Sequence, residues 1–108
     1  MAMVRRGEVF WVQLDPTVGS EIQKTRPCVI VSPSEIHDHL KTAIIAPLTS
    51  AGRPAPFRVP VTFGDKDGLV LLDQIRVVDK RRLVKSMGHL SNEVLSDILS
   101  VLQEIFME

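Results

Sequence analysis

The spacing of the apolar residues is the feature that most constrains the fold of this chain. Up to residue 90 the spacing is typical of short strands, and only after residue 90 is it typical of a helix. Strands rich in β-branched and aromatic residues are expected at 7–14, 25–31, 42–47, 57–63, 68–79 and 82–90. Residues 91–106 carry a wide apolar stripe at helical spacing, and Ser91 stands where it can cap that helix. The pattern predicts an α+β or mainly β fold, with several short strands and one amphipathic C-terminal helix.

The first two strands are expected to form a long hairpin. Strand 7–14 ends at the turn pair Asp15-Pro16, and the loop that follows, 16–24, shows no sustained period before strand 25–31 begins. Loops held on a rigid scaffold are where binding groups are usually found, so this loop is a candidate part of a site.

Two further local signals concern a short helix and a sheet edge. Ser32, Pro33 and Glu35 stand in capping-box order, which predicts a short helix from there to about Leu40. Pro60 lies inside an expected strand, and a proline at such a place indicates an edge strand or a bulge.

Length limits where a site can lie. The 108 residues are expected to form one small domain, 1–108, with a single core and no separate substrate lobe. The chain shows no long apolar run and no signal-peptide order, which predicts a cytoplasmic protein. Cys28 is the sole cysteine and lies within an apolar run, so it is interpreted as a packing residue.

Charge is balanced overall but unevenly distributed. The chain has 13 Lys and Arg against 13 Asp and Glu, which argues against a strongly basic nucleic-acid binder. The segment 76–85 is nevertheless basic, and the segment from Ser91 onward is acidic. The basic run fits either a solvated turn between strands or a patch for phosphates or an acidic partner.

The common catalytic and cofactor motifs are missing from the sequence. His37, Asp38 and His39 are close together, but no further residue with a recognised ligand spacing follows them, so a polar helix end is the preferred interpretation. The chain has no Gly-rich phosphate loop, nucleophile elbow or dinucleotide fingerprint. Neither a metal nor a cofactor is predicted.

Four segments, in their order and separations, carry a resemblance. RGEVFWVQLDPTVGSE (6–21), KTRPCVIVSP (24–33), IIAPLTS (44–50) and GLVLLDQIRVVDKRRL (68–83) are similar to the MazF/PemK family of toxin endoribonucleases. The resemblance covers essentially the whole chain. It implies a small SH3-like barrel of antiparallel strands, with a short helix after the second strand and the C-terminal helix packed outside.

The resemblance also implies an activity and partners. Such proteins act as homodimers and cut single-stranded RNA at short preferred sequences without a metal, leaving a cyclic phosphate and a free 5′-hydroxyl. A MazE-like antitoxin neutralises them. The family's catalytic arginine falls on Arg26 and its catalytic threonine on Thr49.

Elementary chemistry agrees with those two assignments. Attack of a ribose 2′-hydroxyl on its own phosphate builds negative charge on the phosphoryl oxygens, which the paired donors of a guanidinium fit. Pro27 restricts the backbone behind Arg26, so that the arginine needs less reorganisation at the transition state. The hydroxyl of Thr49 is suited to hydrogen-bond the 2′-hydroxyl or a phosphate oxygen.

Other residues are assigned to supporting roles. Because arginine stays protonated and threonine is a poor base, a carboxylate such as Glu21 or Asp73 is a candidate auxiliary group. Some PemK-type members place an Arg two residues before that Asp, but Leu71 stands there in this chain. Trp11 is interpreted as a core residue in preference to a base-stacking one. The predicted RNA-binding residues are Lys24, Ser50, Gln74 and Arg76.

Two functions of other classes remain open at this point. One is a non-catalytic SH3-like RNA-binding or adaptor module, in which Arg26 and Thr49 are binding contacts only. The other is a gyrase poison of the CcdB type, which shares the fold but not the RP and PLTS signatures. Neither the recognised RNA sequence nor the identity of the antitoxin follows from the sequence.

Overall fold

The computed structural model describes residues 3–108 and shows why the strand-like spacing dominates. Within that range the chain forms one seven-stranded sheet, in which every strand pairing is antiparallel. The strands are β1 (Glu8–Gln13), β2 (Thr25–Ile30), β3 (Thr42–Thr49), β4 (Arg58–Phe63), β5 (Lys66–Leu71), β6 (Arg76–Asp79) and β7 (Leu83–His89). The helices are α1 (Ser34–His37) and α2 (Asn92–Ile105), with two 3₁₀ turns, η1 (Leu72–Gln74) and η2 (Lys80–Arg82).

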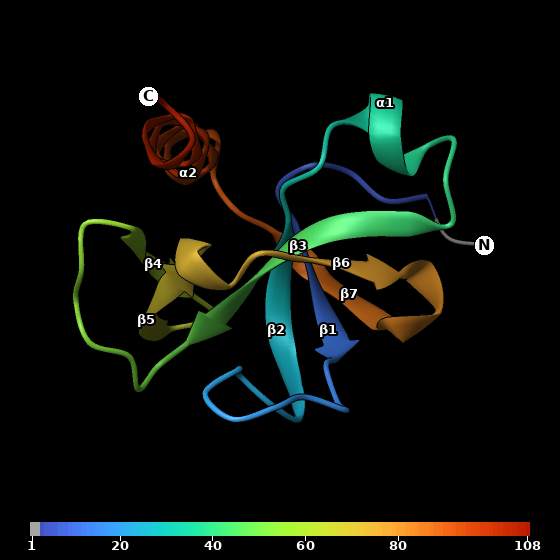
Figure 1. Ribbon diagram of the computed structural model, residues 1–108, viewed down its shortest axis with the longest axis horizontal. Coiled ribbons are helices and arrows are strands. Elements are labelled where there is room, and N and C mark those ends of the chain that lie inside the picture. Colours follow the sequence, from blue (N-terminus) through green and yellow to red (C-terminus); the bar gives the residue numbers. More distant parts are fainter. Residues whose placement is uncertain (1–2) are drawn as a thin grey trace.

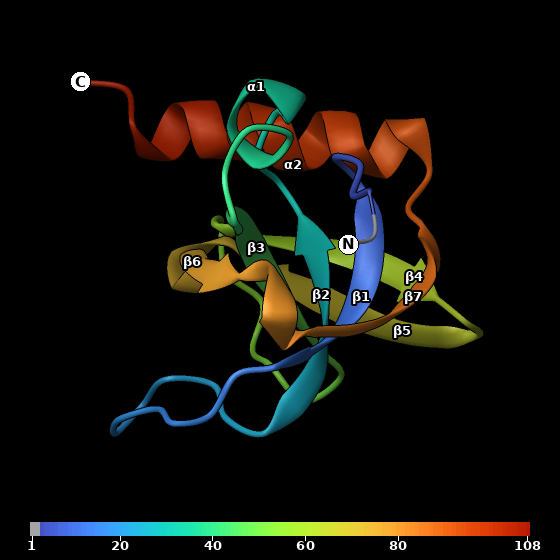
Figure 2. The ribbon, with the colours of Figure 1, turned by 90° about the vertical axis from the view of Figure 1, so that its right-hand side faces the viewer.

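The sheet curls into a half-barrel with both helices outside it. Its strand order is β4-β5-β3-β2-β1-β7, and β6 adds to β3 beside this path. Figure 1 shows α1 and α2 at one end of the curled sheet, while the loop between β1 and β2 projects from the opposite end. Figure 2 shows α2 lying across that first end. The predicted mainly β fold, the β1–β2 hairpin and the external helices are confirmed.

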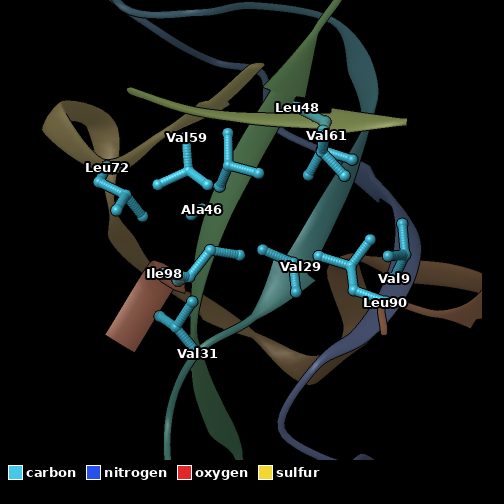
Figure 3. Packing of buried hydrophobic residues seen from close by; sticks show 11 residues of the cluster. Val9, Val29, Val31, Ala46, Leu48, Val59, Val61, Leu72, Leu90 and Ile98 are labelled. Atoms are coloured by element: carbon cyan, nitrogen blue, oxygen red, sulfur yellow. The ribbon is translucent and has the colours of Figure 1, made fainter. Parts of the chain in front are cut away.

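Two apolar clusters form the core. One gathers side chains from the sheet and from α2, including Val29, Ala46 and Ile98, and is drawn in Figure 3. The other includes Phe10 and Cys28. Neighbouring residues of β2 enter different clusters because side chains alternate along a strand. Cys28 is fully buried, which confirms its interpretation as a packing residue.

The two predicted helix caps have different outcomes. Ser91 caps α2 as predicted, because its Oγ accepts a hydrogen bond from the Val94 amide at 3.2 Å. The capping box at Ser32 is wrong: Pro33 occupies the N-cap position of α1 and no side chain caps it. The buried Ser32 hydroxyl instead accepts from the Ile44 amide at 3.1 Å.

The differences at α1 have a physical reason. Once buried, the Ser32 hydroxyl must find partners, and β3 and the ring of His37, at 3.0 Å, supply them. The helix ends at His37 instead of continuing to Leu40. The edge position predicted from Pro60 is confirmed, since β4 pairs with β5 alone. Among residues 3–108, no helix is long and apolar enough to cross a membrane.

Candidate functional site

The ends of β2 and β3 bring Arg26 and Thr49 together. The pairing of these strands ends with Cys28 opposite Pro47, and Arg26 and Thr49 each lie two residues beyond that pair. Both side chains line one hollow of about 320 Å³, hereafter the Arg26 hollow. Its wall also includes apolar and polar groups from β1, β4 and β5: Trp11, Val61, Phe63, Lys66 and Asp67.

The guanidinium of Arg26 is oriented by one hydrogen bond from its Nε. That atom donates to the main-chain oxygen of Gln23 at 3.0 Å, within the β1–β2 loop. The two terminal amino groups make no hydrogen bond to any other part of the chain between residues 3 and 108. Arg26 can therefore present paired N–H donors to a ligand while its backbone in β2 and its Nε are held in place.

Thr49 is the last residue of β3 and is closely surrounded by backbone. Its Oγ1 accepts a hydrogen bond from the Ala51 amide at 3.2 Å, which leaves the hydroxyl proton available for donation. A Cβ added at Gly68 would stand 2.7 Å from the Thr49 main-chain oxygen, and one at Gly52 would stand 2.9 Å from its Cγ2. The two glycines thus allow the chain to approach Thr49 closely.

Trp11 corrects a sequence interpretation. It is 37% exposed and lines the Arg26 hollow, although a core position was preferred from the sequence. Its neighbours Phe10 and Val12 are both buried, so β1 contributes apolar side chains to the core without the Trp11 indole. Trp11 and Phe63 give the hollow an aromatic wall beside the guanidinium and the hydroxyl.

Four of the six remaining predicted residues gather in a second hollow. This space of about 430 Å³, hereafter the Glu21 hollow, is lined by four of them: Glu21, Asp73, Gln74 and Arg76. Ser50 lines the Arg26 hollow. Lys24 lines neither hollow and its main-chain oxygen accepts from the Leu14 amide at 3.0 Å, closing the hairpin loop. The predicted site residues are therefore divided between two hollows.

Although it is larger, the Glu21 hollow is the weaker candidate for the chemistry, because its carboxylates are engaged. The Glu21 Oε1 accepts from the Val18 amide at 2.6 Å. Asp73 accepts from Arg58, Nε to Oδ1 at 3.2 Å and Nη2 to Oδ2 at 3.1 Å. This bond raises the pKa of the Arg58 guanidinium.

The sequence did not single out Arg58. The sequence did show that the arginine expected at position 71 is missing and that Leu71 replaces it. In the sheet, Arg58 of β4 lies directly opposite Leu71 of β5, so the neighbouring strand supplies a guanidinium to Asp73. The signal that would have found it is the register of the β4–β5 hairpin, which the sequence alone does not give.

Gln74 and Arg76 also have partners within the chain. The Gln74 Oε1 accepts from the Ile22 amide at 2.7 Å. Arg76 donates from Nη1 to the Leu14 main-chain oxygen at 3.0 Å. Both residues, predicted to bind RNA, hold the loop between β1 and β2.

The basic segment 76–85 is largely occupied by internal contacts. Besides Arg76, Lys80 donates to the His37 main-chain oxygen, and Arg82 donates to two carbonyls where the β1–β2 loop begins. Arg81 pairs with Asp79 at 3.1 Å and lowers the pKa of that carboxyl. The interpretation as a turn between strands describes residues 80–82, while the side chain of Arg81, which is 88% exposed, and that of Lys85 lie on the surface.

His37, which the sequence placed in a polar helix end, is buried. Its Nδ1 lies 3.0 Å from the Ser32 hydroxyl. In the described part of the chain, 3–108, no three His, Cys, Asp or Glu side chains are grouped so that they could hold a metal ion.

Comparison with known proteins identifies related sequences and folds. The family described as "PemK-like, MazF-like toxin of type II toxin-antitoxin system" matches residues 5–106. Endoribonuclease EndoA of Bacillus subtilis (strain 168) is 34% identical over 107 residues, which cover 94% of this chain and 92% of that protein.

Solved structures share the fold. MazF from Deinococcus radiodurans superposes with a TM-score of 0.85 at 23% identity, covering 97% of both chains. An endoribonuclease in complex with its cognate antitoxin, from Mycobacterial species, superposes with a TM-score of 0.80 at 23% identity, covering 94% of this chain and 93% of that one. The curled antiparallel half-barrel with its C-terminal helix is thus a known architecture.

Proposed function

This chain belongs to the family of PemK-like, MazF-like toxins of type II toxin-antitoxin systems and is an endoribonuclease, and we propose that Arg26 and Thr49 form its catalytic centre. The substrate is single-stranded RNA, and the nucleophile is the ribose 2′-hydroxyl next to the scissile phosphate. The observation that carries the proposal is that one hollow is lined both by a strand-end hydroxyl and by a guanidinium whose terminal amino groups have no hydrogen-bond partner among residues 3–108.

The reaction is an in-line displacement at phosphorus. The 2′-oxygen forms a bond to phosphorus, the bond from phosphorus to the 5′-oxygen breaks, and the products are a 2′,3′-cyclic phosphate and a 5′-hydroxyl. Arg26 donates its terminal N–H groups to the phosphoryl oxygens, where negative charge accumulates. The Thr49 hydroxyl donates a hydrogen bond to a phosphate oxygen, or it hydrogen-bonds the 2′-oxygen and keeps it in line for the attack.

Proton transfer runs through solvent or a phosphate oxygen. Arg26 stays protonated throughout, so its role is to stabilise charge. The carboxylates of Glu21 and Asp73 are bonded to the Val18 amide and to Arg58, which disfavours either one as the base that receives the 2′-hydroxyl proton. We assign both to loop support.

The aromatic wall of the Arg26 hollow supplies a place for bases beside the phosphate. Trp11 and Phe63 offer stacking surfaces, and a base stacked on an aromatic ring contributes roughly 1–3 kcal/mol. Ser50 and Lys66 add polar contacts from the same hollow. Stacking tolerates any base, so the preferred RNA sequence depends on the polar contacts around it.

The protein acts with partners of the same system. We propose that it works in the cytoplasm as a homodimer and that a MazE-like cognate antitoxin inhibits it by occupying the RNA-binding surface. The support is family membership and the existence of a related endoribonuclease structure with its cognate antitoxin bound.

The test is cleavage of a long, mostly unstructured RNA by purified protein in excess EDTA, with the new 5′ ends mapped. We expect recurrent cuts at one short sequence, and a loss on the order of 10²-fold or more in Arg26→Ala and in Thr49→Ala. Arg81→Ala and Thr17→Ala are matched controls, because among residues 3–108 the exposed Arg81 and the half-buried Thr17 use their side chains to bond near neighbours, Asp79 and Asp15.

The outcomes separate the candidate functions. Cuts that survive both catalytic substitutions would refute the assignment of Arg26 and Thr49. Folded wild-type protein that binds RNA without cutting it would indicate a binding module, and arrest of DNA gyrase without RNA cleavage would indicate a gyrase poison.

A further inference from the structure

We propose that the 3₁₀ turn η1 is a bracket that positions the two catalytic side chains through separate paths, with Gln74 acting on Arg26 and Asp73 acting on Thr49. The inference deepens the proposed function, since it depends on these two residues being the catalytic pair. It makes Asp73 and Gln74 positioning residues, where the sequence predicted an auxiliary catalytic group and an RNA contact.

The first path runs through the β1–β2 loop. The side-chain oxygen of Gln74 accepts from the Ile22 amide at 2.7 Å, across 52 positions of sequence. The next residue in the loop, Gln23, accepts from Arg26 Nε through its main-chain oxygen at 3.0 Å. A single peptide unit therefore separates the group that Gln74 holds from the group that orients the guanidinium.

The second path runs through the loop between β3 and β4. Asp73 holds Arg58 by two hydrogen bonds, and the third guanidinium nitrogen of Arg58 donates to the Arg53 main-chain oxygen at 3.2 Å. A Cβ added at Gly52 would stand 3.6 Å from Arg58 Nη1 and 2.9 Å from the methyl group of Thr49. Arg58 and the methyl group of Thr49 thus border the same space beside Gly52.

Adjacent residues in one tight turn thus fix both catalytic groups. Relative placement matters for this reaction, because a 1 Å misplacement at a reacting centre can cost on the order of 10²-fold in rate. The side chains of Arg58 and Asp73 are 21% and 31% exposed and are joined by two parallel hydrogen bonds. Such bidentate pairing adds geometric specificity, which suits a role in positioning.

The test is a set of single-turnover cleavage rates for variants of the full chain. Gln74→Ala removes the acceptor for the Ile22 amide, and Gln74→Glu keeps one. Asp73→Asn removes the carboxylate and so weakens the paired hydrogen bonds to Arg58. We expect Gln74→Ala and Asp73→Asn each to lower the maximal rate by about 10- to 100-fold and Gln74→Glu to retain most of it. Affinity for an RNA with a 2′-deoxy sugar at the cut site should stay unchanged.

Double variants assign each path to its end point. Arg26→Lys has no Nε to bond Gln23, so Gln74→Ala should add little in that background and act fully in Thr49→Ser. Thr49→Ser keeps the hydroxyl but lacks the methyl group that packs on Gly52. Asp73→Asn should therefore add little in Thr49→Ser and act fully in Arg26→Lys. Independent, multiplicative effects in all four combinations would overturn the bracket.

Two other results would also overturn it. A loss of RNA affinity equal to the loss of rate would make Gln74 and Asp73 RNA contacts, and full activity of both single variants would leave them without a role. Hydrogen exchange of the Ile22 amide tests the first path without an RNA-cleavage assay. The exchange rate should increase in Gln74→Ala and stay unchanged in Asp73→Asn. If wild type cuts no RNA, the proposed function fails, while unchanged Ile22 exchange in folded Gln74→Ala refutes the bracket itself.

Discussion

Raising the pH from 8 to 10 is expected to destabilise this protein through one buried thiol. Cys28 lies fully buried in β2, and burial raises the pKa of its thiol to about 12, against the opposing effects of the positive charges on Arg76 and Arg26. Its S–H also donates to the main-chain oxygen of Arg26 at 3.5 Å, a contact that a thiolate loses. Near pH 10 the Cys28 thiol therefore stays protonated in the native state, whereas it ionises in the unfolded chain.

The sign and size follow from linkage. The folded pKa is above the unfolded value of 9.0, so the contribution to stability is complete below pH 9 and is lost as the pH rises toward 12. At pH 10 the unfolded state gains RT ln(1 + 10), about 1.4 kcal/mol, against less than about 0.1 kcal/mol at pH 8. This difference stays nearly the same for any folded pKa above about 11.

The assay is urea unfolding of wild type and Cys28→Ala at pH 8, 9 and 10, with a reductant and at one protein concentration. The substitution has its own packing cost, but this cost does not depend on pH, and the other titrating groups are common to both proteins. The stability advantage of wild type over Cys28→Ala should shrink by about 1.3 kcal/mol between pH 8 and pH 10. An advantage that stays constant over this range would show that the thiol ionises in the folded state and refute the argument.

Three further sets of substitutions test the core, the helix cap and the surroundings of Thr49. Ile98→Ala should cost about 3–4 kcal/mol in urea unfolding, because Ile98 is fully buried between α2 and the sheet, whereas Ile105→Ala at the exposed end of α2 should cost less than about 1 kcal/mol. Ser91→Ala should cost about 1 kcal/mol by removing the α2 cap, and Ser91→Asp should restore most of it; equal stabilities of the two variants would contradict the cap. Gly52→Ala should slow RNA cleavage markedly with little loss of stability, because the new Cβ displaces the Thr49 methyl group, and an unchanged single-turnover rate would refute that contact.

Local patterns predicted most of the fold. The Ser91 cap and the edge position of Pro60 depend on one residue or on close neighbours, and the β1–β2 hairpin joins two successive strands through one loop. All three are confirmed. The capping box at Ser32 has an equally good local pattern and is wrong. Its hydroxyl is buried against β3, and the partner that decides its role, Ile44, lies 12 positions away. Tertiary contact overrides a local preference when the group has no access to water.

The candidate site divides in the same way. The resemblance supplied Arg26 and Thr49, and the ends of β2 and β3 place both on one hollow. The roles of Asp73 and Gln74 depend on partners 15 and 52 positions away, Arg58 and the Ile22 amide, which no spacing in the sequence reveals. A polar residue near a catalytic motif therefore has two possible roles, contact with the substrate or support of the motif, and only the hydrogen bonds distinguish them.

The arginines of the basic segment show why this distinction matters for a chain with no net charge. Arg76 and Arg82 donate to main-chain oxygens at residues 13–15, where the β1–β2 loop leaves the sheet. A guanidinium suits this task because its several donors reach different carbonyls from one rigid plane. Arginines used in this way keep their positive charge, but the donors bonded to the carbonyls are not available for direct hydrogen bonds to phosphate. In the Arg26 hollow, direct contact with RNA depends on the guanidinium of Arg26, on aromatic stacking, and on loops held firmly enough to keep both in place.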